Sequence, residues 1–238
     1  MNKKDFVKFI EKYHLAGNCE QVKITSDANK VSTAFKTQDK NLIGEVHFDG
    51  LELEDAEIGI FETSKLLKIL GALNDEVNIT VNKIGDKCTN LKIKDTSTEA
   101  SYLLADLQVI DKDPSLKKLP PFTLEIKITP EFTEKFIKAK AALPDAVNFA
   151  VVKDSLGTRV VLNYSTTNAT TMTFDVNGTG DDVEAITFSA PLLREVLVAN
   201  KDLGEGVLRI APMGLAQVEF KNENTKSIYH LAKVKLID

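Results

Sequence analysis

The sequence predicts an α+β protein of two similar domains, each built from two repeats of a helix followed by antiparallel strands. One plan, an amphipathic helix and then three strand-like runs separated by turn residues, recurs four times along the 238 residues. The widest spacing between repeats falls in the middle of the chain, which indicates a duplication of a duplication. With 43% hydrophobic residues, the chain has enough apolar side chains to bury a core in each domain without disulfides.

Each repeat opens with a helix whose apolar residues recur at intervals of three and four. In the first helix Phe6, Phe9 and Ile10 share one face, and Gly17 is the expected C-terminal stop. The helices are predicted to begin near Lys3, Ser64, Pro130 and Ala190. The predicted N-caps are Asn2, Thr63, Thr129 and Ser189, and Pro130 and Pro191 lie in first turns, where proline is tolerated.

Between the helices the hydrophobic period changes toward two, which predicts strands with one face on the helices. Asp27 to Asn29 is the expected turn of the first hairpin. The strand blocks cover residues 20–36, 76–94, 146–164 and 206–221. Further strands are expected before the second, third and fourth helices, at residues 56–61, 123–128 and 184–188.

A proline-bearing segment divides the chain. Residues 109–122 hold three of the seven prolines, so they are predicted to be an extended connector between a domain of residues 1–108 and a domain of residues 123–238. Leu116 and Leu119 make this connector partly apolar. Two interpretations remain open: a spacer held along a sheet edge, or the rim of a partner-binding groove.

Cysteine usage and hydropathy indicate the compartment. Cys19 and Cys88 match no metal or redox spacing, so they are expected to be buried apolar residues in a reducing compartment. No charged leader with an apolar stretch follows Met1, and no run approaches the roughly 18 apolar residues of a membrane span. A soluble cytoplasmic protein without membrane contacts is therefore expected.

The distribution of charge is more informative than its total. The formal net charge is −5, which alone argues against a nucleic-acid coat. The four helical segments nevertheless carry eleven basic and six acidic residues, whereas the remainder of the chain has a net charge of −10. A lysine-rich solvated face is common on surface helices, but four equivalent faces on one surface would add their fields.

The helical wheel assigns these lysines to outward faces. Lys4, Lys8 and Lys12 are predicted opposite the apolar face of the first helix, and Lys65 and Lys68 away from that of the second. The candidate DNA-facing residues are Lys4, Lys8, Lys12, Lys65, Lys68, Lys135, Lys138, Arg194 and Lys201.

Signatures of catalysis are weak. His14, His47 and His230 are scattered and are not paired with a nucleophile, and residues 178–180 lack the context of a dinucleotide loop. The acidic cluster Glu52, Glu54, Asp55 and Glu57 could bind a cation, but it is more typical of a solvated loop. We therefore predict no catalytic residues, no metal and no cofactor.

Taken together, these residues resemble the DNA polymerase sliding clamps, specifically the compact two-domain type of tailed bacteriophages. The resemblance rests on the order of elements over nearly the whole chain. It also rests on Ile58 to Phe61 leading into the helix with Leu66, Ile69, Leu70 and Leu73, on Pro120 to Phe122, and on the final strand from Tyr229 to Ile237.

This resemblance implies a DNA-clamp fold whose helices line a ring, in a non-enzymatic processivity factor. It implies a homo-oligomer that encircles double-stranded DNA without sequence preference, that a clamp loader opens, and that tethers the replicative polymerase. It also implies a role with late transcription factors, which stays open, and the host bacterial cytoplasm as the location.

Geometry favours a homotrimer for such a ring. Helices packed side by side lie about 8–10 Å apart, so eight helices from a dimer would enclose a bore of about 15 Å and twelve from a trimer about 28 Å. A DNA duplex is near 20 Å across, judged from its groove depths. Only the trimer passes duplex DNA with room for water.

Two further expectations concern contacts. The ring is predicted to close by strand pairing between the amino-terminal domain of one subunit and the carboxy-terminal domain of the next. The resemblance implies that partners insert peptide tails under the connector, with walls from Leu116, Leu119, Pro120, Phe122, Leu236 and Ile237.

Two alternatives to a sliding clamp remain open. One is a repeat-built structural ring or shell protein of a virion, and the other is an enzyme that uses the acidic cluster.

Overall fold

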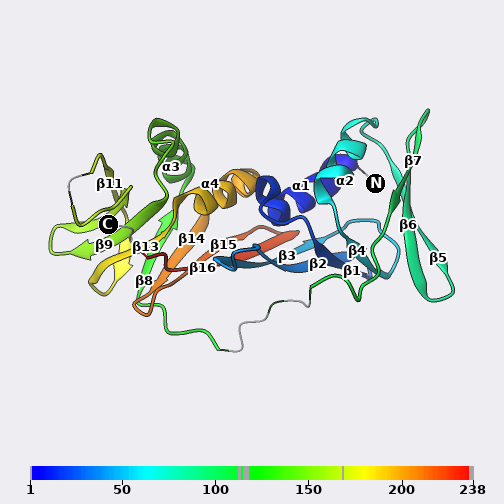
Figure 1. Ribbon diagram of the computed structural model, residues 1–238. Helices are drawn as coiled ribbons and strands as arrows, with labels where there is room; N and C mark the ends of the chain where they lie inside the picture. Colours follow the sequence, from blue (N-terminus) through cyan, green and yellow to red (C-terminus); the bar gives the residue numbers. More distant parts are fainter. Residues whose placement is uncertain (1, 112–113, 115–117, 168, 236–238) are drawn as a thin grey trace. The chain divides into compact units, whose positions relative to one another are not determined.

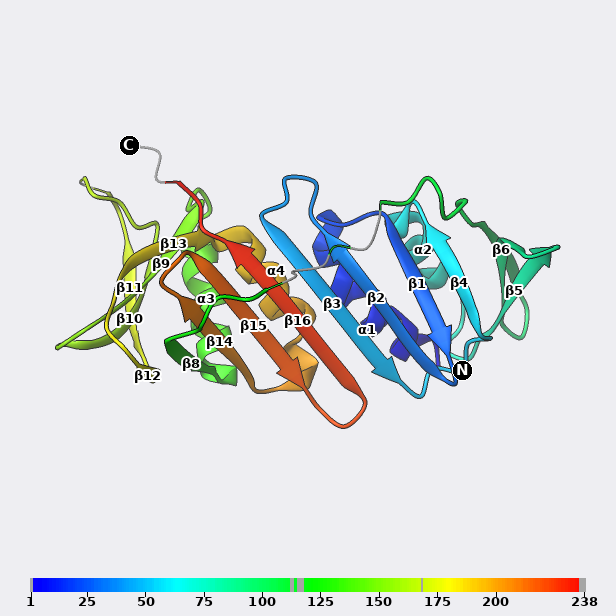
Figure 2. The same ribbon diagram turned by 90° about the horizontal axis from the view of Figure 1, so that it is seen from below.

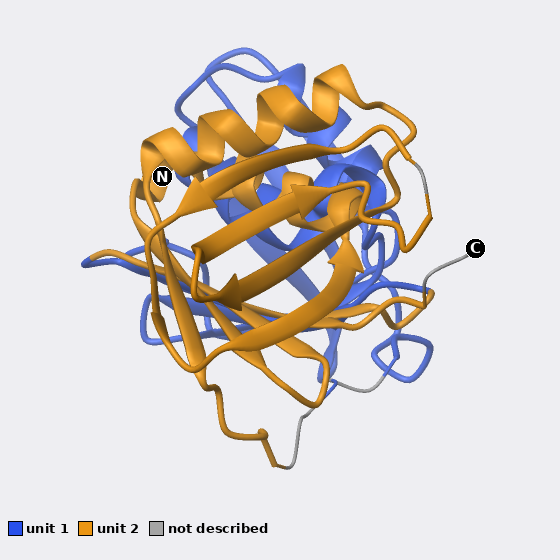
Figure 3. Cartoon of the chain, turned by 90° about the vertical axis from the view of Figure 1, so that its left-hand side faces the viewer, with its two compact units in different colours: residues 1–38, 44–115, 223–227 blue, residues 39–43, 116–222, 228–238 orange. Residues whose placement is uncertain are grey.

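The computed structural model describes residues 2–111, 114, 118–167 and 169–235. The chain forms two compact units, drawn in blue and orange in Figure 3. The first comprises residues 1–38, 44–115 and 223–227, and the second comprises residues 39–43, 116–222 and 228–238. Leu116, Leu236 and Ile237, which were predicted to bind partners, lie outside the described residues.

The first unit combines two helices with two antiparallel sheets (Figure 1). One sheet has the order β3-β2-β1-β4 and the other the order β5-β6-β7. Figure 2 shows β4, β1, β2 and β3 side by side, with α1 and α2 on one face. The elements are α1 (Lys3–His14), β1 (Val22–Asp27), β2 (Lys30–Lys36), β3 (Leu42–Asp49), β4 (Ala56–Ile60), α2 (Thr63–Gly71), β5 (Asn78–Ile84), β6 (Lys87–Lys94) and β7 (Glu99–Leu103).

The first helix forms where its caps and apolar period predict. Asn2 accepts a hydrogen bond from the Lys4 amide at 2.9 Å, as an N-cap does. The helix ends at Leu15, which is left-handed with φ 48°, and a short 3₁₀ turn (Leu15–Gly17) follows. The stop therefore comes two residues before the expected Gly17. Phe9 and Tyr13 on the buried face pack edge to face, 5.7 Å between ring centroids.

The first hairpin turns where predicted, but Asp27, which was expected in the turn, is the last residue of β1. Asp27 pairs with Lys30, and the two turn residues Ala28 and Asn29 both have positive φ, 48° and 63°. A two-residue turn in which both residues have positive φ has a backbone twist that matches the right-handed twist of the two strands. Along β1 buried and half-buried residues alternate, so one face lies on the core.

The predicted cap of α2 is wrong. Thr63 is the first helical residue, and Glu62 occupies the N-cap position without a side-chain cap. The Thr63 hydroxyl instead donates to the carbonyl oxygen of Glu20 at 2.8 Å. A residue distant in sequence therefore takes the hydroxyl that a local cap would use.

The second unit repeats the plan. One sheet has the order β12-β8-β14-β15-β16, and the other the order β11-β10-β9-β13. Thr129 and Ser189 cap α3 and α4 as predicted, accepting from the amides of Phe132 and Leu192. The elements are β8 (Leu124–Ile128), α3 (Pro130–Ala142), β9 (Asn148–Asp154), β10 (Gly157–Leu162), β11 (Met172–Val176), β12 (Gly178–Gly180), β13 (Val183–Ser189), α4 (Ala190–Ala199), a 3₁₀ turn (Lys201–Leu203), β14 (Gly206–Ala211), β15 (Leu215–Lys221) and β16 (Thr225–Ala232).

Aromatic side chains fill the core under α3. Phe136 is fully buried and meets Phe149 edge to face at 5.5 Å and Phe174 at 6.5 Å. This cluster ties the helix to β9 and β11, which lie apart in sequence. Aromatic pairs of this geometry add to the stabilisation that burial alone provides.

The two cysteines differ in environment. Cys19 is buried, and burial raises the pKa of its thiol to about 12. Cys88 on β6 is only half-buried, so the expectation that both are buried is wrong for this residue. Both are free thiols.

Candidate nucleic-acid interface

An open depression of about 530 Å³ lies between α1 and α2. Lys4 and Lys8 from α1 belong to its lining, together with Asp75, which follows α2. Val7 and Leu67 add apolar surface. The depression thus combines cationic groups with an apolar floor, along which lysine stems can lie while their ammonium groups stay in water.

Ion pairs at this depression are exposed. The Lys4 ammonium lies 2.8 Å from a carboxylate oxygen of Asp75, and both side chains are more than half exposed. Their hydrogen bond and mutual attraction raise the pKa of Lys4 and lower the pKa of Asp75. Lys8 lies 4.0 Å from Asp5. Exposed pairs of this kind contribute little to stability, so these ammonium groups can exchange partners.

The structure corrects the placement of Lys12. Its side chain is 1% exposed, so it does not lie on the outward face of α1. Lys12 is one residue before buried Tyr13 and three after buried Phe9, which puts it at the margin of the apolar face rather than opposite it. Lys12 is therefore withdrawn from the DNA-facing set.

The lysines of α2 are on the outward face, as predicted. Lys65 and Lys68 are both exposed, whereas Leu66 and Leu70 are buried. Lys65 lies 3.5 Å from Glu62. Lys68 has no ion pair within the part of the chain that the structure describes.

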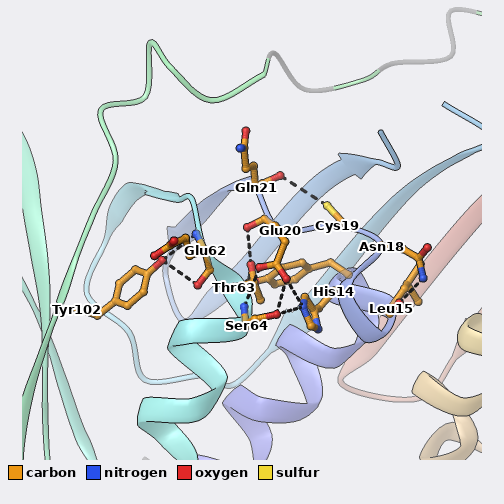
Figure 4. A network of polar contacts seen from close by, with 11 residues as sticks. His14, Leu15, Asn18, Cys19, Glu20, Gln21, Glu62, Thr63, Ser64 and Tyr102 are labelled. Carbon is orange, nitrogen blue, oxygen red and sulfur yellow. Dashed lines mark hydrogen bonds and ion pairs between the residues drawn. The ribbon is translucent and has the colours of Figure 1, made fainter. Parts of the chain in front are cut away.

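A polar network fixes α1 against α2 (Figure 4). The imidazole Nε2 of His14, at the end of α1, lies 3.1 Å from both Glu20 Oε1 and Ser64 Oγ. Glu20 Oε2 accepts from the Ser64 amide at 2.8 Å, so this carboxylate caps α2 in place of a local side chain. The network sets the spacing of the two helices that carry the lysines.

The same network is not a catalytic triad. Burial acts to raise the pKa of Glu20, but hydrogen bonds from Ser64 and His14 outweigh it, and the net effect lowers this pKa. Ser64 and Glu20 both approach the same nitrogen of His14, whereas a relay needs the carboxylate on the other ring nitrogen. The arrangement serves as a helix cap.

The basic residues of α3 have acidic neighbours. Lys138 lies 3.0 Å from Glu134, and this hydrogen bond lowers the pKa of Glu134. Lys135 is exposed beside Glu131, whose pKa is lowered by a backbone amide, by Thr129 and by this lysine. The face of α3 therefore alternates in charge.

The remaining two candidates lie in and after α4. Arg194 is in contact with Glu195, and its side chain is 41% exposed. Lys201 is exposed in the 3₁₀ turn after the helix, and its charge acts on Glu134.

Of the predicted partner-binding residues, three are described. Leu119 is 40% exposed, whereas Pro120 and Phe122 are half-buried. They precede β8 in a segment without regular structure.

A second apolar depression, of about 400 Å³, was not predicted. Phe61, Leu103 and Val109 line it and are 47%, 79% and 61% exposed. It lies beside β7, the edge strand of its sheet. The alternation of side chains along β7 could have indicated this exposed apolar surface. Tyr102 is buried, so the next residue, Leu103, points outward.

The described residues include neither a candidate metal site nor a candidate membrane span. No group of three or more His, Cys, Asp or Glu side chains in that part of the chain is placed to hold a metal ion. None of the helices described is long and apolar enough to cross a membrane.

The architecture is that of the DNA sliding clamps, as solved structures show. The chain is similar to A. fulgidus PCNA in a structure with the bound C-terminal region of FEN-1, with a TM-score of 0.76, 16% identity, and coverage of 100% of this chain and 98% of that one. Proliferating Cellular Nuclear Antigen from Entamoeba histolytica matches with a TM-score of 0.76, 15% identity and coverage of 99% and 97%.

A third match is the PCNA2-PCNA3 complex from Sulfolobus tokodaii, with a TM-score of 0.74, 9% identity and coverage of 98% and 97%. No family model and no curated protein matches the sequence. At these identities the likeness establishes the fold, which is the DNA-clamp fold that was predicted.

Proposed function

We propose that this protein is a DNA polymerase processivity factor, a ring-shaped sliding clamp that encircles duplex DNA and tethers the replicative polymerase. The observation that supports it best is the likeness to solved clamps over 98–100% of the chain. A virion shell protein would not need that fold, so the structural alternative is not favoured.

The proposed DNA-facing residues are the eight that remain after Lys12 is withdrawn. They carry cationic groups on long side chains at helix surfaces, which suits attraction of phosphates and not base readout. They are Lys4, Lys8, Lys65, Lys68, Lys135, Lys138, Arg194 and Lys201.

We assign ring closure to β7 and β11. Both are edge strands of their sheets, β7 in the first unit and β11 in the second. Exposed edges that carry apolar side chains are aggregation-prone unless a partner covers them, and exposed Leu103 ends β7 with exposed Phe61 in the same depression. The other edge strand of the β11 sheet is β13, and the segment after β16 covers part of it. There the Val234 amide donates to the carbonyl oxygen of Thr187 at 2.9 Å. Pairing of β7 with β11 of the next subunit would close a homotrimer.

The connector is the proposed site for partner peptides. Leu119 offers an exposed apolar side chain beside Pro120 and Phe122, and one solved clamp holds the C-terminal region of another protein. The proposed partners are the polymerase, the clamp loader and, as an open alternative, late transcription factors. Three equivalent sites would raise a modest affinity by multivalency.

The remaining parts of the proposal concern organisation and origin. We propose domain boundaries at residues 1–108 and 123–238, joined by residues 109–122, and no enzymatic activity. The proposed origin in a tailed bacteriophage, and hence in the host bacterial cytoplasm, rests on the resemblance in the order of elements over nearly the whole chain.

Primer extension tests the function. On a singly primed circular template with the cognate polymerase, loader and ATP, and with excess competitor DNA to trap released polymerase, the protein should lengthen the products of one binding event. Products of unchanged length would contradict the proposal.

A further inference from the structure

The two units differ in the charge that their helices present. Apart from buried Lys12, α1 and α2 carry five lysines against Asp5 and Glu11, a net charge of +3. Apart from buried Lys140, α3 and α4 carry three basic and three acidic residues, a net charge of zero. The 3₁₀ turn after α4 adds Lys201 and Asp202, which cancel.

Ion pairs occur in both units. Lys138 is held by Glu134 and Arg194 by Glu195, in each case by an acid on the same helix. In the first unit Lys3 and Lys4 lie near Asp75 and Lys65 near Glu62, and these two acids, which flank α2, reduce the excess positive charge from +3 to +1. Lys68 has no ion pair among the residues that the structure describes, so a positive excess remains on the first unit.

The surfaces beside the helices differ in the same way. The depression between α1 and α2 has Lys3, Lys4 and Lys8 against Glu11 and Asp75, a net charge of +1, beside an apolar floor. The depression of about 350 Å³ next to α3 has Lys127 and Lys135 but also Glu131 and Asp175, so its charges balance. Cationic groups at an apolar floor suit a phosphodiester strand, whose phosphates are anionic and whose deoxyribose faces are largely apolar.

We propose that the first unit supplies the main phosphate contact, through the groove between α1 and α2, and that α3 and α4 form a nearly neutral wall. This inference rests on the proposed function and makes it more specific. A clamp with this asymmetry would hold the duplex against three equivalent basic sites, one in each subunit, and not against a uniform lining.

Asp75 regulates the strength of this contact. Its carboxylate lies 2.8 Å from the Lys4 ammonium, and the pair is exposed enough to exchange with solvent ions. A DNA phosphate therefore competes with Asp75 for the same ammonium group. Removing the carboxylate frees Lys4 for phosphate.

Two double variants of the full-length protein test the asymmetry. Lys4→Glu with Lys8→Glu, and Lys135→Glu with Lys138→Glu, change the charge of each subunit equally. Affinity for a fluorescein-labelled linear duplex is measured by anisotropy at several salt concentrations. We expect the first pair to weaken binding about tenfold and to flatten the dependence on salt, and the second to weaken it less than about threefold.

Each outcome has a definite meaning. Equal losses, or a larger loss from the α3 pair, overturn the inference and leave the proposed function intact. Wild-type protein that assembles but binds no duplex at low salt overturns both. Circular dichroism checks the folding of each variant, and Lys4→Gln with Lys8→Gln replaces the first pair if that pair unfolds.

A gain of affinity provides an independent test. Asp75→Asn keeps the shape of the side chain and the backbone carbonyl that accepts from the Lys3 amide, but removes the competing charge. We expect binding about two- to threefold tighter, whereas Asp86→Asn, an exposed turn residue of the same unit, should have less effect. Unchanged or weaker binding by Asp75→Asn, relative to wild type, would overturn the role given to this groove.

Discussion

At the scale of single residues, one carboxylate organises the end of α2 and the turn between β6 and β7. Asp95 accepts from the backbone amides of Asn74, Ser97 and Thr98, at 2.8, 2.8 and 2.6 Å. These hydrogen bonds, the one from Asn74 foremost, lower the pKa of Asp95 to about 2, from 3.8 in the absence of such contacts. The folded protein therefore favours the ionised carboxylate.

The sign of this shift gives a pH-dependent prediction. Because the folded pKa is lower than the unfolded pKa, the stabilisation is present above about pH 4 and disappears as the pH falls toward 2. Asp95→Asn should lower Tm by several degrees at pH 7 and reduce the loss of Tm between pH 4 and 2.

Thermal unfolding at fixed protein concentration between pH 2 and 7 measures both effects. Asp86→Asn is the control, since this residue is exposed in the turn between β5 and β6. A Tm profile of Asp95→Asn that coincides with the wild-type profile would show that the three amides do not depend on the charge.

Single residues also show where sequence reasoning fails. The caps Asn2, Thr129 and Ser189 were predicted because a cap depends only on residues within one turn. The prediction that Thr63 is an N-cap was wrong because Glu20, far away in sequence, accepts the hydrogen bond of the Thr63 hydroxyl. The Glu20 carboxylate also accepts from the amide of the next residue, Ser64. The prediction that Lys12 lies on the outward face was wrong because a helical wheel does not show how wide the buried face of the helix is.

At the scale of elements, the free edge of β7 gives a prediction on assembly. Leu103 is 79% exposed in the single chain, so Leu103→Asp should leave the fold of the subunit intact. If β7 pairs with β11 of a neighbour, the buried charge should shift the protein from trimer toward monomer.

Light scattering over a range of concentrations measures the assembly. The matched control is Leu156→Asp, because Leu156 is 80% exposed but lies at the tip of the β9–β10 hairpin. An equally stable trimer of Leu103→Asp would exclude this edge from the interface.

The connector carries a separate prediction. Leu119→Ser with Ile237→Ser should weaken binding of the carboxy-terminal tail of the cognate polymerase about tenfold or more, because apolar anchors dominate small peptide interfaces. Titration of a labelled tail peptide provides the affinity, and Met213→Ser, at another exposed apolar residue, is the control. Unchanged affinity in a variant that still assembles would remove the connector as the peptide site.

Elements were predicted unevenly from the sequence. The four helices and the first hairpin have strong local signals, namely caps, turn residues and a regular apolar period. Bounds for β7 and β11 were not predicted, because short strands at sheet edges have few buried residues to set a period. The candidate assembly surface lies on these strands, so it emerged only from the structure.

At the scale of the whole molecule, the account requires a closed ring around DNA. Three chains of 26.2 kDa give about 79 kDa, and a trimer is the smallest ring whose bore passes a duplex. The order of elements along the sequence was sufficient to predict the clamp fold. The difference in helix charge between the units was not predicted, because the charges of the four helices were considered only as a sum.

Threading onto DNA tests the central claim most directly, since a closed ring can enter a linear duplex only through its ends. Binding is measured at low salt and high protein concentration on one biotinylated linear duplex, with both ends free or with both ends blocked by streptavidin. We expect strong binding to the open duplex and loss of most of it when the ends are blocked. Equal binding to the two forms would contradict encirclement and would indicate a protein that adheres to the outside of DNA.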